Sequence, residues 1–422
     1  MANEYLNIDD QEKLFSEFIS PGVVAELAEK SKMFANVQKD WKKVDTSGKY
    51  AKQTVMVETA QSVGASSTDD YPESRQSTPE ETQVFMKRIT MGSIGFSNFA
   101  LMAARKTGGK GGAVMAPIEF EKKGVFITAA DDISRQLLGD GSGRLCRVNG
   151  AVGVSTTVVV DNAKFAKATK FLKAGRILDD DVGDGTTQHD AGEIDSVDSD
   201  TQITLKANTS IDDDDYLYND NIITTDNEKA GVGEAMGLDG IIDDDDPPHP
   251  NATNGLQQLA VGSYPVWTSY VVDNGGTPRA LDENRWVEIL DEISDFGIPK
   301  VGLCSTGVRR AWYEYLKSFK SLPNQKSMWG GFSGLPFFYD GKEIPIVPDK
   351  FVRDGAIYFL NTDYLTFHVM APEVINWEKG TSGGILQKVA GKSRFVAEFY
   401  VYGNIGVSIR AAMGKELDIE EK

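Results

Sequence analysis

Residues 384–393 read GILQKVAGKS and contain the Gly-Lys-Ser triplet that ends a phosphate-binding P-loop. In a P-loop, backbone N–H groups surround the phosphates and the lysine reaches them. The motif requires a glycine five positions before Gly391, and Leu386 occupies that position. An extended pattern follows the triplet, whereas a P-loop opens a helix. A β-turn before a strand is therefore the favoured interpretation.

Two other glycine-rich segments have the residue types of a nucleotide site or a nucleophile. Gly139, Gly141 and Gly143 miss the G-x-G-x-x-G spacing, and they follow a helical pattern where a dinucleotide fold needs a strand. Asp140 would repel a pyrophosphate, so a helix stop and a turn are predicted. Residues 331–335 read GFSGL and fail the nucleophile-elbow pattern at the fifth position.

Histidine and cysteine offer little material for a metal site or a nucleophile. His189, His249 and His368 show no metal-ligand spacing, and the first two lie in polar stretches where exposure is expected. Cys146 and Cys304 are too few for a disulfide framework and are predicted to be core residues. This cysteine usage suits folding in a reducing cytoplasm.

The aspartate runs raise the possibility of calcium binding. A loop that starts at Asp180 has Asp184 and Gly185 in the positions of an EF-hand, but Val182 and Ala191 spoil positions three and twelve. A solvated acidic face is favoured, with weak divalent-cation binding as the alternative. The sequence therefore predicts no catalytic, cofactor-binding or metal-binding residue, and a protein that is not an enzyme.

Charge is unevenly distributed along the 422 residues. Residues 177–250 hold 22 of the 63 acidic residues but only 2 of the 44 lysines and arginines, so the rest of the chain is nearly neutral. The clustered cations of a nucleic-acid binder are missing from the sequence pattern. No apolar run reaches the length of a membrane span.

A long helix is predicted over residues 116–139. Pro117 suits a first helical turn and Gly139 suits the position after the last one. A shorter helix at 96–105 and a connector at 106–112, which could also form an anion-binding nest, precede it. Apolar residues at helical spacing mark one face of the long helix: Ile118, Val125, Ala129, Ile133 and Leu137.

The N-terminal part cannot bury itself. Residues 1–45 carry two amphipathic helices that are too short to be stable alone. Strand patterns at 53–58 and 82–89 flank a polar stretch, 61–80, which has almost no apolar residues. We expect a long hairpin whose polar tip is either mobile or held by a neighbouring subunit.

The remainder is mixed α/β. A strand at 152–160 is expected to be buried on both faces because it is rich in β-branched residues. The acidic segment 177–250 is expected to form a small β-rich unit with its acids outward. Further elements are predicted as strands at 192–197, 201–205, 300–304, 344–347, 356–360, 365–370 and 394–410, and as helices at 284–296 and 306–319.

Several stretches, in this order, resemble those of tailed-phage major capsid proteins with the Hong Kong 97-type fold. Residues 133–143, ISRQLLGDGSG, resemble the end of the spine helix of that family. Residues 330–335, 344–349 and 357–360 resemble segments of its axial domain, and 394–410 resemble its closing strands. The resemblance covers nearly the whole chain and implies an α+β fold.

The resemblance also implies a domain plan. The spine helix at 116–139 would belong to the peripheral domain, and the acidic β-rich insertion at 177–250 would be an addition to the axial domain. The parts would be an N-terminal arm (1–45), an extended E-loop (46–95), a peripheral domain (96–145 and 364–422) and an axial domain (146–363).

By resemblance, the function is that of a structural shell subunit. Copies would assemble as hexamers and pentamers into an icosahedral head around double-stranded DNA, which they would contact non-specifically. A separate scaffolding protein, a portal and decoration proteins would be partners, with no membrane, and assembly would occur in the host cytoplasm. The alternatives are an encapsulin-like compartment of the same fold and a calcium-binding surface or adhesion protein.

Overall fold

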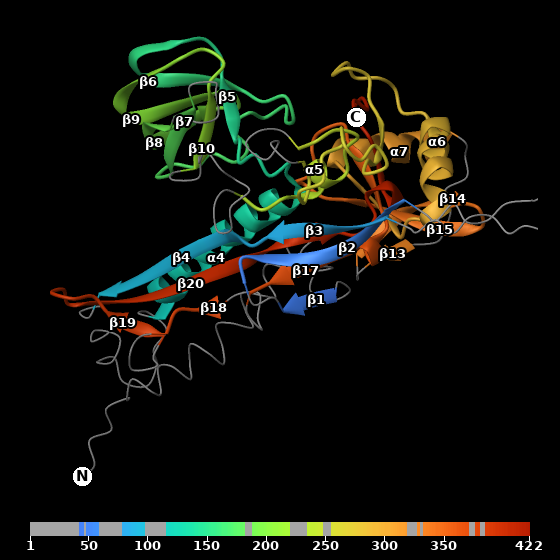
Figure 1. The fold of residues 1–422 in the computed structure, drawn as a ribbon. Helices are drawn as coiled ribbons and strands as arrows, with labels where there is room; N and C mark the ends of the chain where they lie inside the picture. Colours follow the sequence, from blue (N-terminus) through green and yellow to red (C-terminus); the bar gives the residue numbers. More distant parts are fainter. Residues whose placement is uncertain are drawn as a thin grey trace, which may run out of the picture.

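The computed structural model describes residues 42–45, 48–58, 78–97, 115–181, 188–219, 234–247, 255–318, 327–329, 332–370, 376–379 and 385–422. The helices predicted in the N-terminal arm, the connector 106–112 and the hairpin tip lie outside these residues. The described part is elongated (Figure 1). A long helix and its sheet form one end, a second sheet with two helices forms the other, and a barrel stands beside the long helix.

The long helix is α4, Met115–Leu138, and its predicted limits are confirmed. Its apolar face packs on a sheet, where the Phe126 ring lies 5.5 Å from that of Phe399. Near its end, Gln136 Nε2 donates a 2.7 Å hydrogen bond to the backbone oxygen of Ile89. The helix is therefore fixed to the sheet along its second half by both apolar and polar contacts.

The sheet beneath α4 is built around β20, Arg394–Val407. β4, Lys87–Ser97, runs antiparallel along one edge, and three shorter strands pair with β20 as well. These strands are β17 (Leu365–Val369), β18 (Asn376–Trp377) and β19 (Leu386–Lys388), and β17 also pairs in parallel with β1 (Lys42–Asp45). The strands predicted at 365–370 and 394–410 are thus confirmed, except that the second ends at Val407 and Arg410 lies in a 3-10 turn. The helix predicted at 96–105 is wrong at its start, because Phe96 and Ser97 pair with Phe395 and Arg394 in the sheet.

A separate two-stranded hairpin consists of β2, Tyr50–Glu58, and β3, Thr78–Phe85. The strand predicted at 82–89 is divided between β3 and β4, since Met86 breaks the run and turns inward. Ala51, Val84 and Met86 form a small apolar cluster at the base of the hairpin. The predicted hairpin is confirmed in its two strands.

The second sheet has seven strands and carries helices α6, Glu283–Ile293, and α7, Thr306–Ser318. Both predicted helices are confirmed, and their indole rings Trp286 and Trp312 lie 4.9 Å apart in the core. The strands, in spatial order, are β11 (Tyr270–Val272), β21 (Gly414–Glu416), β16 (Ile357–Leu360), β12 (Val301–Cys304), β15 (Lys342–Pro348), β14 (Phe332–Tyr339) and β13 (Ser327–Trp329). Short 3-10 turns lie at η1 (Ser294–Phe296), η2 (Thr362–Tyr364) and η3 (Arg410–Ala412).

The β-rich unit is a closed six-stranded barrel with its own apolar core. Its strands, in order around the barrel, are β10 (Tyr216–Asn219), β5 (Cys146–Val148), β6 (Val152–Asp161), β9 (Gln202–Ile211), β8 (Gln188–Ser199) and β7 (Ile177–Asp181). Strands predicted at 192–197 and 201–205 are confirmed. Closure pairs every strand on both sides, so the barrel has no open edge.

Two expectations about this unit are corrected. β6 is not buried on both faces, because Val154 is 82% exposed and Val159 41% exposed on the outside of the barrel. The β-rich unit also begins at Cys146, before the acidic segment 177–250. Residues 234–247, with helix α5 (Leu238–Ile241), leave the barrel and pack into the main core through Leu238 and Ile241.

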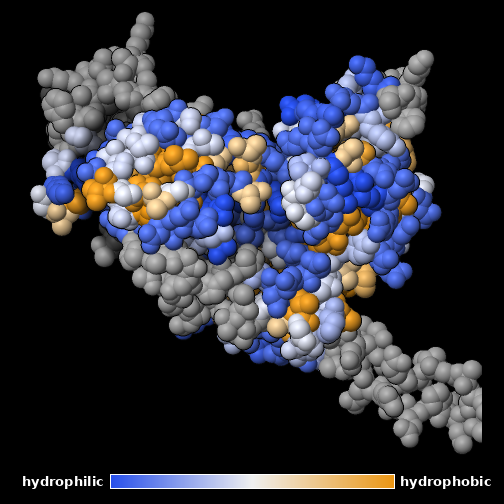
Figure 2. All heavy atoms as spheres, turned by 90° about the horizontal axis from the view of Figure 1, so that it is seen from above, coloured by the Kyte–Doolittle hydropathy of each residue, from blue (hydrophilic) through white to orange (hydrophobic). Residues whose placement is uncertain are grey.

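Seen from above, the surface is mainly hydrophilic, with smaller hydrophobic patches between hydrophilic regions (Figure 2). Within the described residues, no helix combines the length and the apolar character needed to cross a membrane.

Candidate functional site

The P-loop-like segment is a β-hairpin, as the sequence favoured. β19 and β20 flank it, and Val389 N donates to Arg394 O at 3.1 Å to close the turn. Gly391 has a φ of 71°, which a glycine adopts without strain. The lysine and serine of the motif therefore lie on a hairpin, not at the start of a helix.

The glycines after α4 form the predicted helix stop. Gly141 and Gly143 have φ angles of 77° and 80° and turn the chain toward the barrel. The Asp140 carboxylate accepts hydrogen bonds from Ser142 N at 3.0 Å and Ser142 Oγ at 2.6 Å. Asp140 therefore shapes the turn, and it also takes part in a larger polar network described below.

The remaining candidate residues are dispersed. His189 lies in strand β8 and not in a loop, and His249 lies outside the described residues. His368 is buried in β17. Cys146 and Cys304 are both free and buried, which confirms their prediction as core residues.

The calcium-loop interpretation is not compatible with the structure. Asp180 lies in strand β7, paired with β8 and β10, and its side chain is buried inside the barrel region. An EF-hand ligand at position one would instead begin an open loop. The expectation that the acids point outward is also only partly correct, since Asp179, Asp215 and Asp239 are buried as well. Among the described residues, no group of three or more His, Cys, Asp or Glu side chains is arranged to hold a metal ion.

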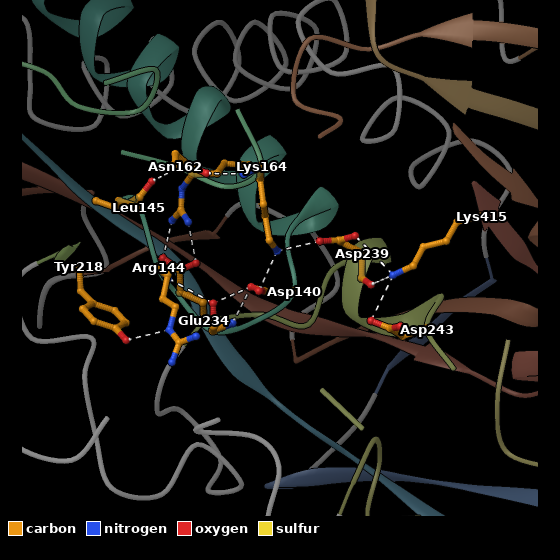
Figure 3. A network of polar contacts seen from close by, with 12 residues as sticks. Asp140, Arg144, Leu145, Asn162, Lys164, Tyr218, Glu234, Asp239, Asp243 and Lys415 are labelled. Atoms are coloured by element: carbon orange, nitrogen blue, oxygen red, sulfur yellow. Dashed lines mark hydrogen bonds and ion pairs between the residues drawn. The ribbon is translucent and has the colours of Figure 1, made fainter. Parts of the chain in front are cut away.

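The most elaborate polar site is the junction of helix α4, the barrel and the second sheet (Figure 3). Lys164 comes from the connection between β6 and β7, and its ammonium group lies between two carboxylates (Figure 3). It donates to Asp140 Oδ2 at 2.8 Å and to Asp239 Oδ2 at 2.7 Å. Asn162, at the start of the same connection, donates to Leu145 O at 2.7 Å and fixes the path of the chain. One lysine thus joins the end of α4 to helix α5.

Asp239 is the centre of this junction and is buried. Its second oxygen accepts a 2.9 Å hydrogen bond from Tyr358 Oη, and Lys415 Nζ lies 3.6 Å from the same atom. Lys415 also lies 3.1 Å from Asp243 Oδ2, as Figure 3 shows. Burial alone would raise the pKa of Asp239, but Lys164 and Lys415 outweigh it and hold this pKa well below its usual range. The carboxylate is therefore ionised, and it is compensated by two lysines.

A second charged pair joins the last turn of α4 to the segment 234–247. Arg135, in the last turns of α4, holds both carboxylate oxygens of Glu234 and contacts Asp132 at 3.0 Å. Both Arg135 and Glu234 are buried. A bidentate pair of this kind fixes orientation as well as distance, so the chain that returns from the barrel is held against the helix.

Beside these pairs lies a pocket of about 260 Å³. Arg144 lines it, donates to Tyr218 Oη at 3.3 Å, and stacks 4.0 Å above the centre of the Tyr216 ring. Its cations are largely compensated, because Lys164 meets two carboxylates and Arg147 meets Asp161 at 2.7 Å. Lys164 fixes the barrel to the body through partly buried ion pairs, so the arrangement has a structural role.

Sequence reasoning missed this junction, although one signal was available. Basic residues recur every third position in the connection between β6 and β7: Lys164, Lys167, Lys170, Lys173 and Arg176. Their partners are scattered, with Lys173 on Asp131 at 3.0 Å and Lys170 at 4.0 Å from Asp354. The basic run marks the connection that contacts the body, but no local sequence signal identifies the acidic residues with which it forms ion pairs.

No known family model and no curated protein sequence matches the chain. Its fold is similar to that of a chain in the cyanophage A-1(L) capsid asymmetric unit, with a TM-score of 0.53 and 13% identity over 92% of this chain and 93% of that one. Weaker likenesses are found to the capsid of a native GTA particle (TM-score 0.42, 11% identity, 92% and 90% covered) and to the SrpI encapsulin complex of Synechococcus elongatus (0.41, 7%, 92% and 88%). The predicted phage capsid fold is confirmed.

Proposed function

We propose that this chain is the major capsid protein of a tailed bacteriophage and forms the icosahedral shell around its double-stranded DNA. The observation that carries the proposal is the likeness to the cyanophage A-1(L) capsid chain, which extends over more than nine-tenths of both chains. A likeness of that extent concerns most of the chain and not one shared motif.

The shape of the described part supports a role in assembly. The hairpin β2–β3 forms a two-stranded sheet that pairs with no other described strand, and such a sheet needs packing on other elements to be stable in water. Its β3 strand is held to its own subunit by Gln83 N, which donates to Gln257 O at 3.1 Å, and by Asn404 Nδ2, which donates to Phe85 O at 2.9 Å. The hairpin would gain stability if another subunit packed against it. Head-to-tail contacts between identical subunits generate closed rings and shells.

Within this proposal, the domain plan keeps the limits expected from the sequence. Residues 1–45 act as the N-terminal arm, 46–95 as the E-loop, 96–145 and 364–422 as the peripheral domain, and 146–363 as the axial domain. The chain acts as a structural component and not as an enzyme. Its partners are further copies of itself in hexamers and pentamers, together with scaffolding, portal and decoration proteins, and it contacts the packaged DNA non-specifically. The assembled protein resides in the virion after assembly in the host cytoplasm.

Electron microscopy of the full chain, produced together with its assembly factor, tests the proposal. We expect closed, uniform particles in negative stain. Monomers or amorphous aggregates under all assembly conditions would contradict it. Closed particles that contain a cargo protein, with no DNA after nuclease treatment and extraction, would instead favour an encapsulin-like compartment.

A further inference from the structure

A second cavity, of about 160 Å³, lies on the side of α4 that faces the connection between β6 and β7. It shares Arg135, Phe171 and Phe351 with the larger pocket at the junction. We call it the cationic cavity, because five basic side chains but only two acidic ones line it. These are Arg135, Lys170, Lys173, Arg176 and Lys350, with Asp131 and Asp132.

Both acids of the cationic cavity already have partners. Asp131 bridges two lysines, with Lys173 Nζ at 3.0 Å and Lys350 Nζ at 3.3 Å. Asp132 accepts hydrogen bonds from Arg135 and Gln136, each at 3.0 Å. The walls therefore retain positive charge after these pairs are formed, in a chain whose formal net charge is −19.

Two cations of the cavity are the least compensated. Lys170 lies 3.9 Å above the Phe165 ring, and its nearest carboxylate partner, Asp354, is 4.0 Å away. Arg176 is half-buried, and in the described part of the chain its guanidinium makes a single hydrogen bond, from Nη1 to Phe171 O at 2.9 Å. Burial lowers the pKa of both groups, which means that the surrounding carboxylates do not offset the loss of water. A guanidinium with donors left over and an ammonium whose carboxylate partner is at the limit of an ion pair thus line one small volume.

We propose that the cationic cavity binds a phosphate group, held by Arg176 and Lys170. A guanidinium offers parallel N–H donors that match two oxygens of a phosphate, and an ammonium adds a point charge. The doubly charged anion matches the surplus of cations, and the cavity of about 160 Å³ is well above the roughly 10–15 Å³ that one water requires. The phosphate can belong to free inorganic phosphate or to a nucleic-acid backbone. The inference rests on this cavity alone and is independent of the proposed function.

Calorimetric titration of the full-length protein with inorganic phosphate tests this site. The variants Arg176→Gln and Lys170→Gln remove one ligand each, and we expect each to weaken binding roughly tenfold or more. Lys167→Gln is the matched control, because Lys167 lies on the same connection but pairs with Asp200 at the surface, outside the cavity. The control should bind phosphate like the unmodified protein. Because Arg176 is half-buried, its replacement could also disturb folding. Lys350 lines the cavity but is exposed, so Lys350→Gln should fold normally and still weaken phosphate binding.

A second titration, with a short DNA duplex, distinguishes the two sources of phosphate. Duplex binding that inorganic phosphate displaces and that the same variants lose assigns the site to a nucleic-acid backbone. Phosphate binding without duplex binding assigns it to a free phosphate. No binding of phosphate by the unmodified protein, or equal losses in Lys167→Gln and in the cavity variants, would overturn the proposal.

Discussion

At the scale of single residues, Lys164 is a test of the junction, because its ammonium joins the end of α4 to α5 through two carboxylates. Lys164→Met removes the ammonium that contacts the carboxylates of Asp140 and buried Asp239. We expect the free energy of unfolding to fall by about 3 kcal/mol, since removal of one partner leaves a buried charge uncompensated. Urea denaturation of the purified chain measures it.

The control for this change is Lys167→Met on the same connection. Lys167 and its partner Asp200 are both more than half exposed, and exposed pairs contribute about 1 kcal/mol or less. A loss as large in this control as in Lys164→Met would show that burial of the pair has no special role.

His368 predicts a pH dependence of stability. The ring is buried in β17, and within the described residues neither nitrogen has a hydrogen-bond partner. Burial lowers its pKa to about 4, below the value of about 6.5 in an unfolded chain. The unfolded state therefore binds more protons between these values, so this contribution is present above about pH 6.5 and is lost as the pH falls toward 4. The maximal loss is about 3 kcal/mol.

His368→Leu removes the titrating group and keeps a side chain of similar size. Unfolding free energies measured by denaturant titration at several pH values should show a smaller decrease on acidification in the variant than in the unmodified protein. The other titrating groups occur in both proteins, so the difference between the two curves reports on His368. Parallel curves would contradict the prediction.

At the scale of elements, the contact between the segment 234–247 and the end of α4 leaves no space for a side chain at Gly237. A Cβ there would lie 2.2 Å from the backbone oxygen of Gln136 and 2.5 Å from that of Gly139. The φ of Gly237, −106°, suits any residue, so the cost of Gly237→Ala arises from packing alone. We expect a loss of about 1–3 kcal/mol in unfolding free energy. Gly262→Ala, where no described atom lies within 4 Å, should be nearly neutral in the same denaturation experiment.

Elements whose signals are local were predictable, and those set by distant pairing were not. α4 follows from one apolar face and a glycine stop, because buried Ala129, Ile133 and Leu137 repeat at helical spacing. β6 was expected to be wholly buried because valine and threonine occupy both faces, yet only barrel closure decides which face is inside. β6 pairs with β9 and β5 with β10, across intervals that contain other strands.

The junction was beyond prediction for the same reason. Lys164 and Asp239 are separated by 75 positions, and Arg135 and Glu234 by 99. The sequence supplies the basic run and the acidic segment, but their pairing depends on the barrel's position beside α4. Asp140 was assigned to a turn, and that assignment is confirmed, while its bond to Lys164 has no local signal.

At the scale of the whole molecule, the acidic residues are concentrated in the barrel and in the segment that follows it. Residues 177–250 hold 22 acids and 2 lysines. The structure divides the described ones between the barrel and the segment that returns to the core. The basic connection between β6 and β7 lies between the barrel and the acids of the body, where Lys164, Lys170 and Lys173 meet Asp140, Asp354 and Asp131. The more exposed of these pairs are screened by salt, whereas the partly buried pair of Lys164 and Asp239 is screened less. The contribution of this pair to holding the barrel should therefore depend less on ionic strength than that of the exposed pairs.

Shortening the hairpin β2–β3 allows an effect on assembly to be distinguished from an effect on the folding of the single chain. Glu58 lies opposite Thr78, so an Asn-Gly turn can join them in place of residues 59–77 without changing the register. The base of the hairpin, with Ala51, Val84 and Met86, is retained. If a neighbouring subunit holds the polar tip, which is one of the two alternatives that the sequence left open, the shortened chain should lose closed particles in sedimentation velocity and negative stain. We expect it to keep its circular dichroism spectrum and unfolding midpoint. Particles of normal size and yield would show that these residues have no role between subunits, and a chain that no longer folds would show that they serve their own subunit.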